Sequence, residues 1–143
     1  MLPAEPAAVF WELILPPDDF RFYRENISLL EERVVQSFPD GYKAPWILAA
    51  IRSVPRHLFV HPGYKSLAYT DNAFPTGSGL TTSAPSVIAR MIYHAGVSAG
   101  DRLLEIGTGT GYQAAVLAEM GVRVFTIEID RSMAETAGRI LAR

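Results

Sequence analysis

Three glycines on alternate positions, Gly107, Gly109 and Gly111, separate an apolar run from a helical pattern. The run 102–106 ends at these glycines and predicts a buried strand, whereas the apolar spacing within 111–120 predicts a helix. Glycine is needed where the backbone takes unusual dihedral angles or where a ligand approaches the main chain. A strand, a glycine turn and a helix in this order restrict the chain to an α/β fold.

A second strand and a second helix follow. Residues 122–129 are rich in β-branched side chains and predict a strand, and residues 131–143 predict a helix. The resulting βαβα unit is the element from which parallel sheets with right-handed crossovers are built. The expected fold is therefore Rossmann-like, preceded by helices over 21–38, 45–51 and 85–95.

Proline and glycine divide the rest of the chain. The opening residues 1–19 are expected to be irregular, because four prolines there each remove a backbone donor and fix φ: Pro3, Pro6, Pro16 and Pro17. A turn is expected at 38–41 and a long loop at 61–84, which is rich in Gly, Pro, Ser and Thr. We divide the chain into an N-terminal irregular and helical segment, 1–43, and a domain that carries the glycine turn, 44–143.

Composition limits the partners of this chain. The formal charge of −2 gives no general attraction to nucleic acid or to anionic membranes. There is no cysteine, which fits a reducing cytoplasm, and no apolar run long enough to span a bilayer. The three histidines His57, His61 and His94 lack the spacing of metal ligands, so no metal is expected and they are interpreted as surface or structural residues.

Two acidic residues flank the glycine turn. Glu128 comes 17 residues after Gly111 at the end of the second strand, where a carboxylate accepts hydrogen bonds from ribose hydroxyls. Glu105 precedes the first glycine, where it repels a pyrophosphate but suits a cationic ligand. The spacing G-x-G-x-G differs from the dinucleotide fingerprint, and no P-loop is present. These features favour S-adenosylmethionine as the cofactor and leave NAD as the weaker choice.

Residues 103–113 (LLEIGTGTGYQ) resemble the glycine-rich motif of the protein-L-isoaspartate O-methyltransferase family. Residues 54–60 (VPRHLFV) are similar to the family's VPRxxFV segment. Residues 69–75 (YTDNAFP) and 79–85 (GLTTSAP) are similar to its substrate-side loop, commonly PIGxGQTISxP. The resemblance covers about 44–129 and implies a class I methyltransferase fold, with 44–143 a partial S-adenosylmethionine-binding domain.

The resemblance also implies a reaction and roles for particular residues. The reaction is methyl transfer from S-adenosylmethionine to an isoaspartyl or aspartyl carboxylate of a protein or peptide, in the manner of a protein-repair enzyme. The catalytic residues would be Ser83, near the acceptor carboxylate and the transferred methyl group, and Thr81 in the same loop. The cofactor would be bound by Glu105, Gly107, Thr108, Gly109, Gly111 and Glu128, the last of these at the ribose.

The chain departs from the family pattern in two ways. Leu80 stands where the family usually has glutamine, and Thr76 and Thr82 replace isoleucines, so a more specialised peptide substrate stays open. The family also continues with further strands beyond the last helix predicted here. We therefore expect that the 143-residue chain alone is not an efficient enzyme and that it can self-associate through its uncovered sheet edge. A catalytically silent module that binds the cofactor or a partner is the first alternative function. An NAD-dependent oxidoreductase is the second, which the glycine spacing and Glu105 disfavour.

Several residues also have a plainer interpretation. Ser83 could cap the helix that begins near Pro85, and Asp71 could lie near the substrate or form an Asx turn with Asn72. The remaining predictions concern packing and solvation. Phe20, Phe22 and Tyr23 are expected to pack on the core, and Arg131, Arg139 and Arg143 to lie on the solvated face of the last helix.

Overall fold

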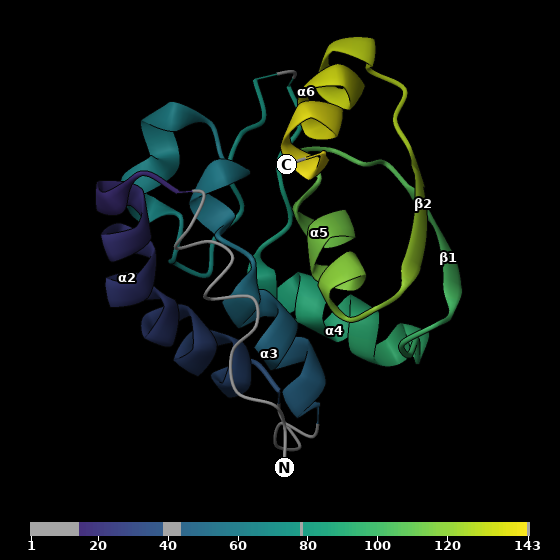
Figure 1. The fold of residues 1–143 in the computed structure, drawn as a ribbon, viewed down its shortest axis with the longest axis horizontal. Helices are drawn as coiled ribbons and strands as arrows, with labels where there is room; N and C mark the ends of the chain where they lie inside the picture. Colours follow the sequence, from purple (N-terminus) through teal and green to yellow (C-terminus); the bar gives the residue numbers. More distant parts are fainter. Residues whose placement is uncertain (1–14, 39–43, 78, 143) are drawn as a thin grey trace.

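The computed structural model describes residues 15–38, 44–77 and 79–142 (Figure 1). In these ranges, several helices precede the first of two strands, and one further helix follows each strand. The helices are α2 (Pro17–Gln36), α3 (Pro45–Ser53), α4 (Pro85–Ala95), α5 (Tyr112–Glu119) and α6 (Arg131–Leu141), the 3₁₀ helices η1 (Arg56–Leu58) and η2 (Pro62–Leu67), and the strands β1 (Arg102–Ile106) and β2 (Arg123–Ile127).

The two strands are parallel and adjacent, and α5 connects them. The register pairs Leu104 with Phe125, Glu105 with Thr126 and Ile106 with Ile127. In Figure 1, α5 lies against one face of the strands, and α6 follows β2 back toward the same side. The predicted α/β, Rossmann-like arrangement with a helical segment ahead of it is confirmed.

The prediction that residues 17–19 are irregular is wrong, because α2 begins at Pro17. Proline is tolerated in the first turn of a helix, where its missing N–H has no partner to lose. Asp18 and Asp19 also lie in this first turn, where carboxylates interact favourably with the helix dipole. The irregular structure expected for 1–14 and the turn expected around 39–41 fall outside the described residues, as does Arg143.

The core lies among α2, α3, α4 and α5. Its fully buried side chains include Leu30 and Val34 of α2 and Ile51 of α3. The prediction that the early aromatic residues pack on the core is confirmed: Tyr23 is buried and its hydroxyl donates to the carbonyl of Arg52, while Phe20 and Phe22 pack against the same cluster. The apolar faces of these amphipathic helices thus pack together into one shared core.

The segment 61–84 is more ordered than a long loop. Pro62 starts the helix η2, and His61 Nδ1 accepts a hydrogen bond from the N–H of Gly63 at 3.2 Å. Further along, residues 74–77 and 79–82 form the two arms of a narrow hairpin, which a bridge between Pro75 and Thr81 joins. Sequence periodicity missed both features because each is only a few residues long.

The opposite face of the strand pair is apolar and exposed. Its side chains are Leu104, Ile106, Phe125 and Ile127, and Ile129 follows on the same alternation; Ile106 is 71% exposed and Ile129 98%. No helix among the described residues covers this face, which is the open side of the strands in Figure 1. We call these five residues the open sheet face.

Candidate functional site: a cavity at the glycine turn

The glycine turn takes left-handed backbone angles at each of its three glycines. The φ angles are 88° at Gly107, 56° at Gly109 and 89° at Gly111. A Cβ atom added at Gly107 or Gly109 would meet nothing within 4 Å, so the missing side chains leave open space beside the main chain. At Gly111 the same atom would lie 3.2 Å from Leu141 Cδ1, so this glycine lets α6 pack against α5.

Glu128 holds the turn from the end of β2. One carboxylate oxygen accepts a hydrogen bond from the N–H of Gly109 at 2.8 Å, and the other accepts from the N–H of Asp130 at 3.0 Å. These two backbone donors lower the pKa of Glu128, so the carboxylate is ionised at neutral pH. The carboxylate thus holds the glycine turn and the start of α6 together, and its role at a cofactor ribose stays a prediction.

Glu105 lies on the covered side of β1 and is only 6% exposed. Its carboxylate accepts a hydrogen bond from the hydroxyl of Thr126 at 2.6 Å, and that hydroxyl lies 2.7 Å from the hydroxyl of Thr108. Burial raises the pKa of Glu105, because the charged carboxylate loses hydration that hydrogen bonds from Thr126 and Gln113 replace only in part. A buried carboxylate of this kind gains from a cationic ligand group beside it.

A cavity of about 270 Å³ brings the two predicted groups of site residues together. We call it the first cavity. It is lined by the catalytic candidates Thr81 and Ser83 and by four of the cofactor candidates, Glu105, Gly107, Thr108 and Gly109. Gly111 and Glu128 do not line it: Gly111 faces Leu141 and Ala137 of α6, and Glu128 accepts a hydrogen bond from the turn at Gly109.

Ser83 does not cap the following helix. The residue at the N-cap of α4 is Ala84, and no side chain there caps the helix. Instead, Oδ1 of Asp71 accepts a hydrogen bond from the N–H of Ser86 at 2.8 Å. The carboxylate thus anchors the start of α4 from a distant part of the chain, which neither earlier interpretation of Asp71 anticipated.

Arg56 is a site residue to which sequence reasoning gave no role. It lines the first cavity at 1% exposure, and its guanidinium donates to the carbonyls of Ala68, Thr70 and Asn72 at 2.7 to 2.9 Å. The guanidinium carbon also lies 5.1 Å from the ring centre of Phe74 and 5.6 Å from that of Tyr112. The VPRxxFV segment was the only sequence signal for this residue. Its contacts fix the backbone that leads into the hairpin.

The histidines are structural or exposed, as predicted. His57 is buried and its Nδ1 lies 2.7 Å from the hydroxyl of Tyr69. Burial lowers the pKa of His57 to about 4, so its imidazole is neutral at physiological pH. Within the described ranges, no group of three or more His, Cys, Asp or Glu side chains is arranged to hold a metal ion. Nor is any helix of that part of the chain long and apolar enough to cross a membrane.

The fold defines a class of protein: a Rossmann-like domain of the class I methyltransferase type, in which a glycine turn follows the first strand and a carboxylate stands at the end of the second. The comparison with protein families agrees. The model of protein-L-isoaspartate(D-aspartate) O-methyltransferase (PCMT) matches residues 30–143, and the chain belongs to this family.

Individual relatives give the extent of the similarity. The chain is 50% identical over 103 residues to the protein-L-isoaspartate O-methyltransferase of Gloeobacter violaceus, a match that covers 72% of this chain and 50% of that protein. It is 40% identical over 126 residues to the enzyme of the same name from Salinibacter ruber, with coverages of 87% and 53%. The chain therefore spans about half the length of these relatives.

Solved structures resemble the fold as well. A protein-L-isoaspartate O-methyltransferase superposes with a TM-score of 0.66 at 29% identity, over 85% of this chain and 38% of that one. A Plasmodium falciparum protein described as a putative enzyme of this kind, in complex with S-adenosyl-L-homocysteine, superposes with a TM-score of 0.63 at 20% identity, over 80% of this chain and 53% of that one.

Proposed function

We propose that this chain carries the S-adenosylmethionine site and the acceptor loop of a carboxyl O-methyltransferase that acts on L-isoaspartyl or aspartyl residues of proteins or peptides. One observation carries the proposal: Glu105, which is buried, and Ser83 line the same cavity. Family membership supports the choice of reaction. The expectation of a cytoplasmic repair enzyme, drawn from the cysteine-free composition and the resemblance, forms part of this proposal.

The residues of the first cavity fit the cofactor on one side and the acceptor carboxylate on the other. Glu105 would hold the cationic amino group of the cofactor, with Gly107, Thr108 and Gly109 leaving room at the main chain. Glu128 would accept the ribose hydroxyls, and Gly111 would leave the main chain free beside them. When bound, S-adenosylmethionine supplies a methyl group on a sulfonium. Ser83 and Thr81 would orient the acceptor carboxylate, which is nucleophilic enough to need no strong base, so alignment and exclusion of water carry the rate.

We also propose that the chain alone self-associates through its strands. The open sheet face exposes five large apolar side chains in one strip, and both strands have a free edge in the described structure. Exposed apolar strips and unpaired strand edges favour association with a second chain.

Calorimetric titration of the purified chain with S-adenosylmethionine tests the cofactor site, with NAD as the control. We expect saturable binding of S-adenosylmethionine and none of NAD. A methyl-transfer assay on an isoaspartyl peptide then tests the reaction, with the aspartyl peptide beside it. Binding without transfer would favour the silent cofactor-binding module, and binding of NAD alone would contradict the proposal.

A further inference from the structure

A second cavity, of about 650 Å³, lies beside the first. Its walls come from the segment 58–62, the hairpin, the glycine turn and one side of α6. Its lining residues are Leu58, Phe59, Val60, His61, Pro62, Thr76, Gly77, Gly109, Thr110, Asp130, Ser132, Met133, Thr136 and Ile140. Of the candidate catalytic and cofactor-binding residues, only Gly109 lines this second cavity.

The two cavities adjoin each other. Phe59, Val60, Gly109 and Thr110 line both of them, so they share a wall. The hairpin also reaches both, because Thr81 lines the first cavity and Thr76 the second. A peptide that presents a carboxylate to Thr81 and Ser83 can therefore extend a neighbouring side chain across this wall.

The lining of the second cavity defines the side chain that it would accept. Leu58, Met133 and Ile140 provide an apolar wall, which suits a long aliphatic stem. Among the described residues of the lining, Asp130 is the only Asp, Glu, Lys or Arg, and His61 is the one histidine. Its Oδ1 accepts a hydrogen bond from the N–H of Met133 at 3.0 Å, and Oδ2 accepts none from the described residues. One carboxylate oxygen thus remains for a cationic group at the end of the stem.

We propose that the second cavity is a subsite for the residue next to the acceptor in a peptide substrate, and that it favours lysine or arginine. This inference rests on the proposed function, because it takes the first cavity as the place of the acceptor carboxylate. Charge complementarity selects the occupant: a glutamate in the same position would face Asp130, and a neutral aliphatic side chain would gain only the apolar wall.

Peptide binding to the chain saturated with S-adenosyl-L-homocysteine tests the subsite without requiring turnover. Three isoaspartyl peptides would carry lysine, norleucine or glutamate at the positions that flank the acceptor. We expect lysine to bind tightest and glutamate weakest, with a total difference of about five- to tenfold measured by calorimetry.

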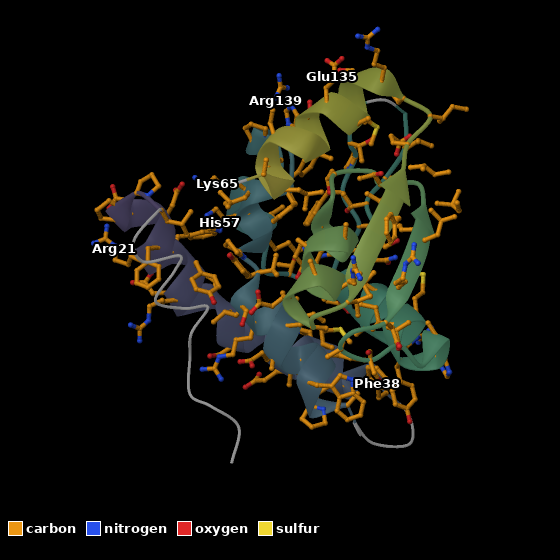
Figure 2. All side chains as sticks on the ribbon, turned by 45° about the vertical axis from the view of Figure 1, so that its right-hand side comes forward. Arg21, Phe38, His57, Lys65, Glu135 and Arg139 are labelled. Carbon is orange, nitrogen blue, oxygen red and sulfur yellow. The ribbon has the colours of Figure 1, made fainter. Side chains whose placement is uncertain are left out.

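The variant Asp130→Asn isolates the charge, because asparagine also caps helices and keeps an acceptor for the N–H of Met133. In this variant, lysine and norleucine peptides should bind equally. Glu135→Gln is the matched control: it also removes one carboxylate charge near the start of α6, but Glu135 pairs with Arg131, points away from the body of the protein in Figure 2 and does not line the cavity. It should keep the preference for lysine.

Three outcomes would overturn the inference. Equal binding of the three peptides, or a lysine preference that survives Asp130→Asn, would exclude a role for Asp130. A loss of S-adenosyl-L-homocysteine affinity in Asp130→Asn as large as the loss for the lysine peptide would assign this residue to the cofactor. The first two leave the proposed function standing if the cofactor and the norleucine peptide bind, whereas a chain that binds neither fails the proposed function and the subsite together.

Discussion

The helical core and the strand pair contain similar apolar side chains in very different surroundings. Leu30 of α2 is completely buried, whereas Leu104 of β1 is 60% exposed. Around Leu30, α2 packs against α3 and α4, but only one face of the strands is covered by α5. The same residue type therefore contributes to stability in one region and to a free surface in the other. Burial, not hydrophobicity alone, determines what each side chain does.

Truncating the two leucines tests this difference most strongly. Leu30→Ala should lower the free energy of unfolding by about 2–5 kcal/mol, because it removes buried methyl groups and leaves a cavity. Leu104→Ala is the matched control and should change it by no more than about 0.5 kcal/mol. Urea denaturation followed by circular dichroism measures both. Equal losses would mean that the open sheet face is covered in solution.

The next prediction concerns the covered face of the strands, where Glu105 is a buried charged residue. Glu105→Gln should weaken binding of S-adenosylmethionine by about 1.5–3 kcal/mol, the usual contribution of a hydrogen bond to a charged group. The measurement is the same calorimetric titration. Unchanged affinity would remove Glu105 from the cofactor site.

The same variant should make the ligand-free chain more stable at neutral pH. The pKa of Glu105 is raised in the folded state, so its contribution to stability is greatest below the unfolded value, near 4.5, and is lost as the pH rises through the raised pKa. Glu105→Gln should lack this pH dependence. Denaturation curves from about pH 4 to about pH 8 compare the two chains. Identical dependence of stability on pH would contradict a raised pKa of Glu105 in the folded state.

Gly109, in the turn after β1, can be compared with a glycine of similar backbone conformation in the helical region. Gly109→Val should weaken cofactor binding by about 1–3 kcal/mol, because valine is strained at a φ of 56° and its side chain fills the ligand space. Gly96→Val, at the end of α4 with φ of 64°, carries similar strain outside the lining of the first cavity. It should lower stability and leave affinity unchanged. Equal affinity losses would show that strain alone is responsible.

The smallest effect on stability is expected on the open sheet face. Ile127→Lys should change the free energy of unfolding by no more than about 0.5 kcal/mol but should reduce self-association. Trp46→Lys replaces an exposed apolar residue of α3 and serves as the control. Sedimentation velocity over a range of concentrations measures both variants. Association that Trp46→Lys reduces as strongly would place the contact elsewhere.

Much of the fold followed from local pattern. Periodicity predicted α4 with its observed bounds, and the apolar run 102–106 predicted β1 in the same way. The start of α2 was missed because Pro17 was taken as a residue that breaks a helix, whereas proline is tolerated in the first turn. In the candidate site, the glycine turn and both acidic residues could be chosen because they are close in sequence or belong to a regular βαβ unit.

The remaining contacts depend on residues that are distant in sequence. Arg56 donates to the carbonyls of Ala68, Thr70 and Asn72. Asp71 anchors the start of α4, and Thr126 donates to Glu105 across the strand pair. No periodicity encodes such pairs, because each exists only after the elements have packed.

The sequence by itself determined the order of helices and strands, the glycine turn and the family to which the chain belongs. These properties arise from local backbone preferences and from motifs that are continuous in the chain. Only the tertiary structure decided that Ser83 and Glu105 line one cavity, that a second cavity adjoins it, and that one face of the strands is uncovered. The physical reason is that burial and proximity are properties of packed elements, and packing is set by contacts between distant parts of the chain.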